Sequence, residues 1–337
     1  MAGVARKVKK RLFNSVSDEL IEIEKRLDAK ITASEKAIQG TQLAINHDHS
    51  LILEELKQRT KNSGSFVLSE REMITKIFSG LKMYLDPRDV AVVPHLVLDS
   101  IWEHRITAAW LSVVKPHDTV LDVGSNFGYF GALAAQKTDK KHSKVVHFEA
   151  NPHLVPYIHK TLDVNWLNEQ SVVENLAVGD KEGTLTLRIL KDYLGSSSVL
   201  PLEHTAKYMS GKMRLETAEE VKVKSVSLDK YCEDNGIKTV DLIKMDIEGF
   251  EDKAYEGMRT IVKNSPNMSF FIEFTRESYE DPKGFYDQML KDFGHVYVID
   301  DDGYITKPKT TTYEAIVGDT DDWVMPIFSK NAKLANR

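Results

Sequence analysis

The sequence predicts an α/β fold, a doubly wound parallel sheet preceded by an N-terminal helical arm. From about residue 70, short apolar runs alternate with mostly helix-length segments, a pattern typical of a parallel sheet covered by helices on both faces. Before residue 62, a seven-residue hydrophobic period without proline favours one long helix. The runs predicted to form strands are TVLDV, KVVHFEA, SVVENLAV, TVDLIKMD and MSFFIEF.

The composition is that of a globular protein of 337 residues, with 42% hydrophobic and 28% charged residues. The net charge of −6 gives no reason to expect a nucleic-acid partner. The single cysteine, Cys232, excludes an internal disulfide and a cysteine-rich metal site. No apolar run approaches the length of a membrane span and no signal-peptide core follows the N-terminus, so we expect a cytoplasmic location.

Residues 1–16 form a basic amphipathic segment. Valine and leucine recur there at every fourth position among lysine and arginine side chains. A helix of this kind can lie on an anionic membrane surface, which would place the protein at the inner face of the membrane. A solvated, frayed start of the following helix explains the same pattern.

Residues 17–60 are predicted to form a coiled-coil-like helical arm. Isoleucine recurs at every seventh residue, at Ile31, Ile38, Ile45 and Ile52. The seam is poor, because the matching d positions hold Ser34, Thr41, Asp48 and Glu55. We expect the arm to join protomers into a homo-oligomer or to bind a partner protein. The alternative is a lone helix packed on its own domain.

Residues 61–69 are predicted to be a linker, residues 70–320 the α/β domain, and residues 321–337 a C-terminal tail. Between the third and fourth strands, GTLTLRIL and EVKVKSVSL indicate an inserted strand pair. Near the end of the domain, HVYVIDDDGYI and TYEAIVGD indicate a hairpin that completes the sheet.

The stretch TVLDVGSNFGYF, residues 119 to 130, indicates where a ligand binds. Asp122 ends the first strand, and Gly124 and Gly128 lie in the turn that opens the next helix, where a bare backbone lets a ligand approach closely. The spacing differs from the G-x-G-x-x-G of dinucleotide sites, and no P-loop lysine follows. Because an acid at the strand end repels phosphate, a ligand with a cationic amine is favoured over a nucleotide phosphate.

Glu149 ends the second predicted strand in VVHFEANP. A strand-end carboxylate at this distance from the glycine turn commonly accepts hydrogen bonds from both ribose hydroxyls, although such acids also occur as helix caps. The turn and this acid together indicate S-adenosylmethionine rather than NAD. An NAD-dependent oxidoreductase is the weaker alternative, because its glycine spacing and a hydride-transfer partner are both missing.

These segments follow in the order of an FkbM-type methyltransferase, which the chain resembles over roughly residues 83 to 318. The resemblance is strongest in LIKMDIEGFE and includes the upstream segment MYLDPRDVAVVPHLVLDSIWEH, whose glutamate is Glu103. It implies a class I S-adenosylmethionine-dependent methyltransferase, usually O-directed. The implied fold is a Rossmann-like sheet of seven strands, the last of them antiparallel.

The resemblance also implies a set of cofactor contacts. The ribose would be held by Glu149, and the adenine would be flanked by Ala177 and Val178. Glu103 is predicted to be a further cofactor-binding residue. The methionine end of the cofactor would be held by Asp122, Gly124, Ser125, Asn126 and Gly128.

Methyl transfer to a hydroxyl needs a group that removes the proton, since a hydroxyl is a poor nucleophile at neutral pH. KMDIEGFE offers three acids. Asp246 and Glu248 are the predicted catalytic residues, as the base or its orienting partner, and Asp246 would face the cofactor's amino group or the transferring methyl. Glu251 is expected to be a first-turn acid stabilised by the helix dipole. Mg²⁺ held by these acids is an alternative way to activate the hydroxyl, but we assign no metal ligands.

The acceptor is predicted less directly. The N/D-P-P-Y/F signature of amino-directed methyltransferases is absent, and KMDIEG takes its place. Because FkbM-type enzymes resemble tailoring enzymes for sugars, polysaccharides and polyketides, the resemblance implies a sugar or glycan hydroxyl, on a surface polysaccharide or its precursor. The alternatives are a polyketide-like small molecule and a non-catalytic assembly protein that recruits a partner through its helical arm.

Overall fold

The structure, a computed structural model, describes residues 64–190, 193–201, 217–318 and 323–335. These residues belong to one compact unit, Leu51–Asn336. The predicted membrane-binding segment 1–16 and the predicted helical arm 17–60 lie outside the described residues.

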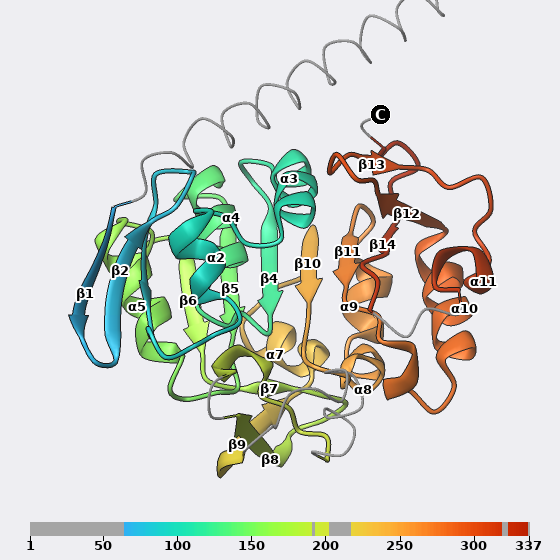
Figure 1. The fold of residues 1–337 in the computed structure, drawn as a ribbon. Helices are drawn as coiled ribbons and strands as arrows, with labels where there is room; N and C mark the ends of the chain where they lie inside the picture. Colours follow the sequence, from blue (N-terminus) through green and yellow to red (C-terminus); the bar gives the residue numbers. More distant parts are fainter. Residues whose placement is uncertain (1–63, 191–192, 202–216, 319–322, 336–337) are drawn as a thin grey trace, which may run out of the picture. The chain divides into compact units, whose positions relative to one another are not determined.

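Eight strands form the central sheet, in the order β13-β12-β14-β11-β10-β4-β5-β6 (Figure 1). The strands β4, β5, β6, β10 and β11 run parallel to one another, whereas β14 runs antiparallel to both β11 and β12. The predicted doubly wound sheet with an antiparallel last strand is therefore confirmed, with β13 as an added edge strand. The bounds are Thr119–Val123 (β4), Lys144–Phe148 (β5), Ser171–Glu174 (β6), Leu242–Met245 (β10), Ser269–Ile272 (β11), His295–Ile299 (β12), Ile305–Thr306 (β13) and Ile327–Ser329 (β14).

The end of the sheet differs from the prediction. HVYVIDDDGYI does form a hairpin, β12 with β13, but TYEAIVGD contains the helix α11, Tyr313–Ile316. Its apolar residues are spaced three and four apart, as on one side of a helix. The antiparallel strand is β14, in residues assigned to a tail, and three buried residues are too few to display a strand period.

The third predicted strand, SVVENLAV, is two strands in two sheets. After β6 the chain turns at Asn175, whose side-chain amide donates a hydrogen bond to the backbone oxygen of Glu149 (2.8 Å). The second part, β7 (Ala177–Val178), joins a small sheet with β8 (Gly183–Leu190) and β9 (Thr217–Val226). Because β8 and β9 pair antiparallel, the predicted inserted strand pair is confirmed.

A three-stranded antiparallel sheet precedes the main sheet and was not predicted. It consists of β1 (Ser65–Ser69), β2 (Glu72–Lys76) and β3 (Lys82–Leu85), so β1 lies inside the segment assigned to a linker. The sheet flanks the helix α5 (Figure 1), where the backbone N–H of Tyr84 donates to Thr161 Oγ1 (3.0 Å).

Helices cover both faces of the central sheet, and alternate strand residues supply two apolar cores. Val120 and Phe271 belong to the first core, and Leu121 and Phe270 to the second. The first core includes α2 (Val93–Leu98), α3 (His104–Val113), α4 (Tyr129–Lys137) and α5 (Val155–Val164). The second includes α7 (Leu228–Asp234), α8 (Glu251–Glu256), α9 (Arg259–Asn264) and α10 (Pro282–Phe293).

Candidate active site

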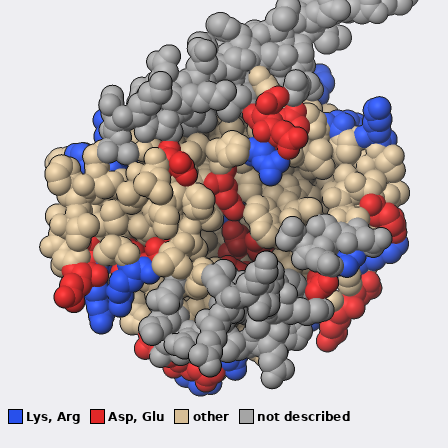
Figure 2. All heavy atoms as spheres, viewed as in Figure 1, with Lys and Arg blue, Asp and Glu red and all other residues tan. Residues whose placement is uncertain are grey.

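Two adjoining cavities contain the carboxyl-end residues of β4 and β10, where the strand order reverses and α/β sheets bind their ligands. The larger has a volume of about 410 Å³ and the smaller about 50 Å³. Gly124, Gly195, Asp246 and Glu248 line both. Figure 2 shows acidic side chains at the bottom of a hollow on this face.

The turn after β4 brings its backbone against the end of β10. Gly124 has a φ of +80°, and a Cβ placed on it would lie 1.8 Å from the backbone oxygen of Asp246. Only glycine fits both the left-handed conformation and this close approach. The next turn residue with positive φ, Asn126 (+54°), lines the larger cavity together with Ser125.

Glu149 is fixed at the carboxyl end of β5 by two backbone donors. Its Oε2 accepts from Asn126 N (2.6 Å), and its Oε1 accepts from Asn151 N (2.8 Å). Burial raises the pKa of Glu149 to about 7. It lines the smaller cavity with the buried side chains of Ala177 and Val178, so the structure brings together the three residues predicted to hold the adenosyl part of a cofactor.

Asp122 and Gly128, also predicted to hold the cofactor, are not among the described residues that line the two cavities. Asp122 is 1% exposed and accepts a hydrogen bond from the backbone N–H of Gly131 (2.8 Å). His147 Nδ1 lies 3.9 Å from its carboxylate, and burial lowers the pKa of His147 to about 3. Asp122 therefore joins β4 to α4. The backbone of Gly128 begins α4 with a φ of +82°.

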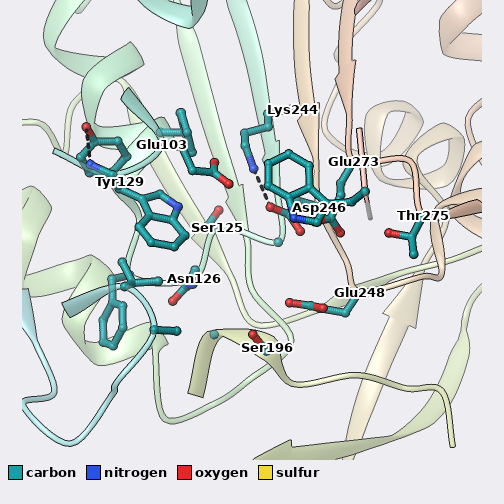
Figure 3. A pocket seen from close by; sticks show the side chains of 18 of the residues that line it. Glu103, Ser125, Asn126, Tyr129, Ser196, Lys244, Asp246, Glu248, Glu273 and Thr275 are labelled. Atoms are coloured by element: carbon teal, nitrogen blue, oxygen red, sulfur yellow. Dashed lines mark hydrogen bonds and ion pairs between the residues drawn. The ribbon is translucent and has the colours of Figure 1, made fainter. Parts of the chain in front are cut away.

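Four acidic side chains and one lysine line the larger cavity (Figure 3). Lys244 Nζ donates to Asp246 Oδ2 (2.9 Å) and lies 4.6 Å from the centre of the Phe130 ring. Burial alone would lower the pKa of Lys244, but the nearby carboxylates outweigh it and raise this pKa, with Asp246 contributing most among them. The remaining acids are Glu103, Glu248 and Glu273.

The three further acids are half-buried, and desolvation is the largest influence on the pKa of each. It raises the pKa of Glu103 to about 7, that of Glu248 to about 8, and that of Glu273 well above its ordinary value. In each case Asp246 adds to the shift through like-charge repulsion. Near neutral pH this cavity therefore contains carboxyl groups that can both bind and release a proton.

Backbone strain is concentrated at the same cavity. Among the described residues, five other than glycine have positive φ, and three of them line it: Glu103 (43°), Asn126 (54°) and Glu248 (58°). Such conformations cost free energy and gather at ligand sites. Glu103 Oε2 and Asn126 Oδ1 are also buried without a hydrogen-bond partner, which leaves two polar atoms available to a ligand.

Glu251 has a structural role rather than a catalytic one. Its Oε1 accepts from the backbone N–H groups of Ile247 (2.9 Å) and Gly249 (3.3 Å), and its Oε2 accepts from the Tyr279 hydroxyl (2.9 Å). It lies in the first turn of α8, as predicted, but its buried carboxylate holds the turn after β10. This arrangement leaves Asp246 and Glu248 at the cavity.

A serine-rich segment, residues 195–199, lines one side of both cavities. A short 3₁₀ helix, Leu194–Ser196, is held by Asp89 Oδ2, which accepts from Leu194 N (3.0 Å). Ser198 Oγ donates to the backbone oxygen of Glu248 (3.0 Å). The anchoring role of Asp89 carried no recognisable signal in the sequence.

Several other lining residues carried no recognisable sequence signal. They come from separate loops and helix starts, and only the fold brings them together. These residues are Trp102, Thr275, Ser278, Leu200 and Trp323.

Within the described part of the chain, the residues whose potential metal-ligand atoms lie within 4.8 Å of one another are His117, Asp139 and His142, not the cavity acids. The Mg²⁺ alternative thus gains no support from the cavity. No helix in the described ranges is long and apolar enough to span a membrane.

The chain is similar to several known proteins. The Methyltransferase FkbM domain matches residues 122–305. Methyltransferase sdnD of Sordaria araneosa is 28% identical over 158 residues, 41% of this chain and 60% of that relative. The solved structure of an FkbM methyltransferase from Methylobacillus flagellatus is 15% identical at a TM-score of 0.36, and the match covers 63% of this chain and 43% of that one. The solved structure of an S-adenosylmethionine-dependent O-methyltransferase from Thermotoga maritima is 12% identical at a TM-score of 0.38, and the match covers 77% of this chain and 78% of that one.

The family match spans more than half of the chain. It includes the glycine turn, Glu149 and the acids after β10 that form the two cavities. The chain spans about 60% of the length of the curated relative that it matches. The protein therefore belongs to the FkbM methyltransferase family.

Proposed function

We propose that the enzyme methylates a hydroxyl group of a sugar or glycan, with Glu248 as the base. The observation that carries the proposal is the composition of the larger cavity. It adjoins the smaller cavity and combines aromatic rings with carboxyl groups. The methyl donor in the proposed reaction is S-adenosylmethionine.

The residues present fit S-adenosylmethionine. Both oxygens of Glu149 keep lone pairs beyond their backbone contacts, which suits the ribose diol. Ala177 and Val178 offer an apolar wall for the adenine. The unpartnered atoms of Asn126 and Glu103 would take the polar methionine end. The cofactor supplies a methyl group already activated on a sulfonium.

The lining of the larger cavity suits a polyol acceptor. Carboxyl groups accept hydrogen bonds from hydroxyls, and Trp102, Phe130 and Trp323 offer rings against which the apolar face of a sugar can pack. Four acids face a single lysine that is already paired with Asp246. Anionic acceptors, such as uronic acids and nucleotide sugars, would be repelled.

Glu248 is better suited than Asp246 to take the acceptor proton. Asp246 is held by Lys244 at 2.9 Å, so one of its carboxylate oxygens is already engaged by a cation. Burial raises the pKa of Glu248 to about 8, close to that of an efficient base at physiological pH. Asp246 would orient Lys244 and the cofactor's amino group.

Calorimetric titration of S-adenosylmethionine into the wild type and Glu149→Gln tests the cofactor contact. We expect the variant to bind about 10- to 100-fold more weakly, because a charge-assisted contact is lost. Glu169→Gln, the same change at an exposed acid paired with Lys140, is the control. Equal affinities of all three proteins would contradict the assignment of Glu149.

Methyl-labelled S-adenosylmethionine then tests the acceptor. The wild type and Glu248→Gln are incubated with neutral oligosaccharides, uronic-acid oligosaccharides, polyketides, protein and RNA. Label on neutral oligosaccharide that depends on Glu248 supports the proposal. Label confined to polyketide, protein or RNA would overturn it.

We further propose that residues 17–60 join protomers or bind a partner protein, and that residues 1–16 bring a cytoplasmic enzyme to the membrane. The sequence patterns alone support both ideas. Co-sedimentation with anionic liposomes tests the second, and equal binding of the wild type and a variant lacking residues 1–16 would contradict it.

A further inference from the structure

A second cluster of functional side chains lies away from the cavities. His117, Asp139 and His142 each bring one potential ligand atom within 4.8 Å of the others. The two histidines are exposed and the aspartate is partly buried. We infer that these three residues form a binding site for a divalent transition-metal ion of the zinc class.

The cluster is built on two short loops that precede neighbouring strands. His117 lies just before β4, and Asp139 and His142 lie just before β5. The loops are joined directly, because the backbone N–H of Asp139 donates to the backbone oxygen of Pro116 (2.6 Å). The three side chains are therefore held near one another without any metal.

Each loop is also shaped by its own hydrogen bonds. Asp118 Oδ2 accepts from the backbone N–H of Lys115 (2.8 Å). Asp139 Oδ1 accepts from the backbone N–H groups of Lys141 (2.8 Å) and His142 (3.1 Å). These turns limit the conformational entropy that metal binding would remove.

The donor set determines the kind of metal. Two imidazole nitrogens and one carboxylate oxygen suit Zn²⁺, Co²⁺ and Ni²⁺, whereas Mg²⁺ and Ca²⁺ prefer oxygen ligands alone. His142 Nδ1 already lies 2.9 Å from Asp139 Oδ1. The rings of His117 and His142 are 5.5 Å apart between centroids, at 87°. Ligand atoms in a tetrahedral zinc site are about 3.3 Å apart, so exposed side chains need only small rotations.

The surrounding charges limit the affinity. Lys115, Lys140 and Lys141 flank the ligands in the sequence, and a nearby lysine opposes cation binding. Lys140 is paired with Glu169 (3.5 Å), which reduces its effect. We therefore expect reversible binding of moderate affinity rather than a permanently loaded site.

The position of the site assigns it a structural role. It lies at the amino ends of β4 and β5, whereas the cavities lie at their carboxyl ends. Five residues of β4 separate the two ends by about 16 Å. A metal bound here would clamp the two loops and stabilise the fold without touching the reacting atoms.

Zinc binding by the full chain tests the inference. The protein is stripped with a chelator, dialysed, and equilibrated with ZnCl₂ before measurement of bound zinc and of Tm. At hundredfold excess over Kd we expect Tm to rise by about 5–10 °C. The double variant His117→Ala/His142→Ala should lose one equivalent of zinc and this rise.

Two control variants test whether zinc binding and the rise in Tm come from the cluster of His117, Asp139 and His142. His95→Ala removes the histidine of an exposed His–Asp pair (3.3 Å) and should bind zinc like the wild type. His47→Ala/His49→Ala removes histidines outside the described residues and should keep the rise in Tm. Far-ultraviolet circular dichroism verifies that each variant folds.

Three results would overturn the inference. They are a wild type that binds no zinc, a His117→Ala/His142→Ala variant that binds as much as the wild type, and zinc binding that disappears in His47→Ala/His49→Ala. MgCl₂ at the same concentration should leave Tm unchanged, and protection by Mg²⁺ would contradict the assigned metal class.

Discussion

Lys244 donates a hydrogen bond to Asp246 across 2.9 Å, inside a cavity that four acids line. Lys244 pairs in register with Asp122 of β4, and both lie on the sheet face covered by α3 and α4. Within the described lining of the larger cavity it is the one cation. The acids that line the larger cavity therefore share a single buried positive charge.

Replacing Lys244 by methionine should destabilise the protein by about 3–5 kcal/mol, because it leaves buried acids without their counter-charge. The free energy of unfolding in urea measures the change. Lys253→Met removes an exposed lysine paired with Asp252 (3.4 Å) and should cost at most about 1 kcal/mol. Similar losses in the two variants would show that Lys244 does not organise the cluster.

Glu248→Gln should lower kcat by about 10²- to 10⁴-fold, the usual contribution of a general base. S-adenosylmethionine affinity should change little, since Glu149 and the glycine turn remain. Burial raises the pKa of Glu248 to about 8, and a base acts in its deprotonated form. Wild-type kcat should therefore rise with pH up to about 8 and then level off.

The control for this change is Glu256→Gln, at an exposed acid on α8, which should keep both the rate and the pH profile. A Glu248→Gln enzyme with an unchanged pH profile would assign the base to another group. Asp246→Asn would then be the next variant, with loss of the Lys244 ion pair measured separately by urea unfolding.

Stability should fall as pH rises from 5 to 8. Burial raises the folded-state pKa of Glu103, Glu149 and Glu251 from about 4.5 to about 7, and that of Glu248 to about 8. The folded state thus keeps protons that the unfolded state has released, and each such carboxyl contributes at most about 1.4 kcal/mol per pH unit. His147, whose pKa burial lowers to about 3, acts in the opposite direction below its ordinary value of 6.5.

The decline should therefore be steepest between about pH 6.5 and 7, where His147 no longer opposes it and the carboxyls of Glu103, Glu149 and Glu251 still hold protons in the folded state. Above pH 7 the slope should become smaller. Urea unfolding at half-unit intervals measures the slope. Glu251→Gln removes one titrating carboxyl and should flatten the curve, while Glu256→Gln, at an exposed position, should leave it unchanged. A wild type whose stability increases between pH 6.5 and 8 would contradict the raised pKa values.

Sequence patterns predicted the parts of the fold that repeat a simple rule. Fully buried parallel strands appear as continuous apolar runs, so β4, β5, β10 and β11 were recognised. The antiparallel strand β14 has three residues and displays no period. Among the described residues, the strands β1 to β3 pair only with one another, beside α5, and they are not part of an alternating βα pattern that would predict them.

The candidate site was predicted where its chemistry follows strand ends. Glu149, Asp246 and Glu248 line the cavities as expected, because the carboxyl ends of neighbouring parallel strands share one edge of the sheet. Asp122 also ends a strand, but strand alternation turns its side chain toward Gly131 (2.8 Å) and α4. The contributions of Trp102 and Asp89 depend on loop packing, which no local pattern encodes.

Gly124→Ala should abolish S-adenosylmethionine binding and destabilise the fold. The new Cβ would lie 1.8 Å from the backbone oxygen of Asp246, so the ends of β4 and β10 would have to separate. Gly236 is the matched control, since it also has a positive φ (+66°) but no heavy atom within 4 Å of its Cβ position. Gly236→Ala should cost about 1–2 kcal/mol from the left-handed backbone alone. Urea unfolding and calorimetry compare the variants, and equal stability together with wild-type binding by Gly124→Ala would contradict the close approach of these two strands.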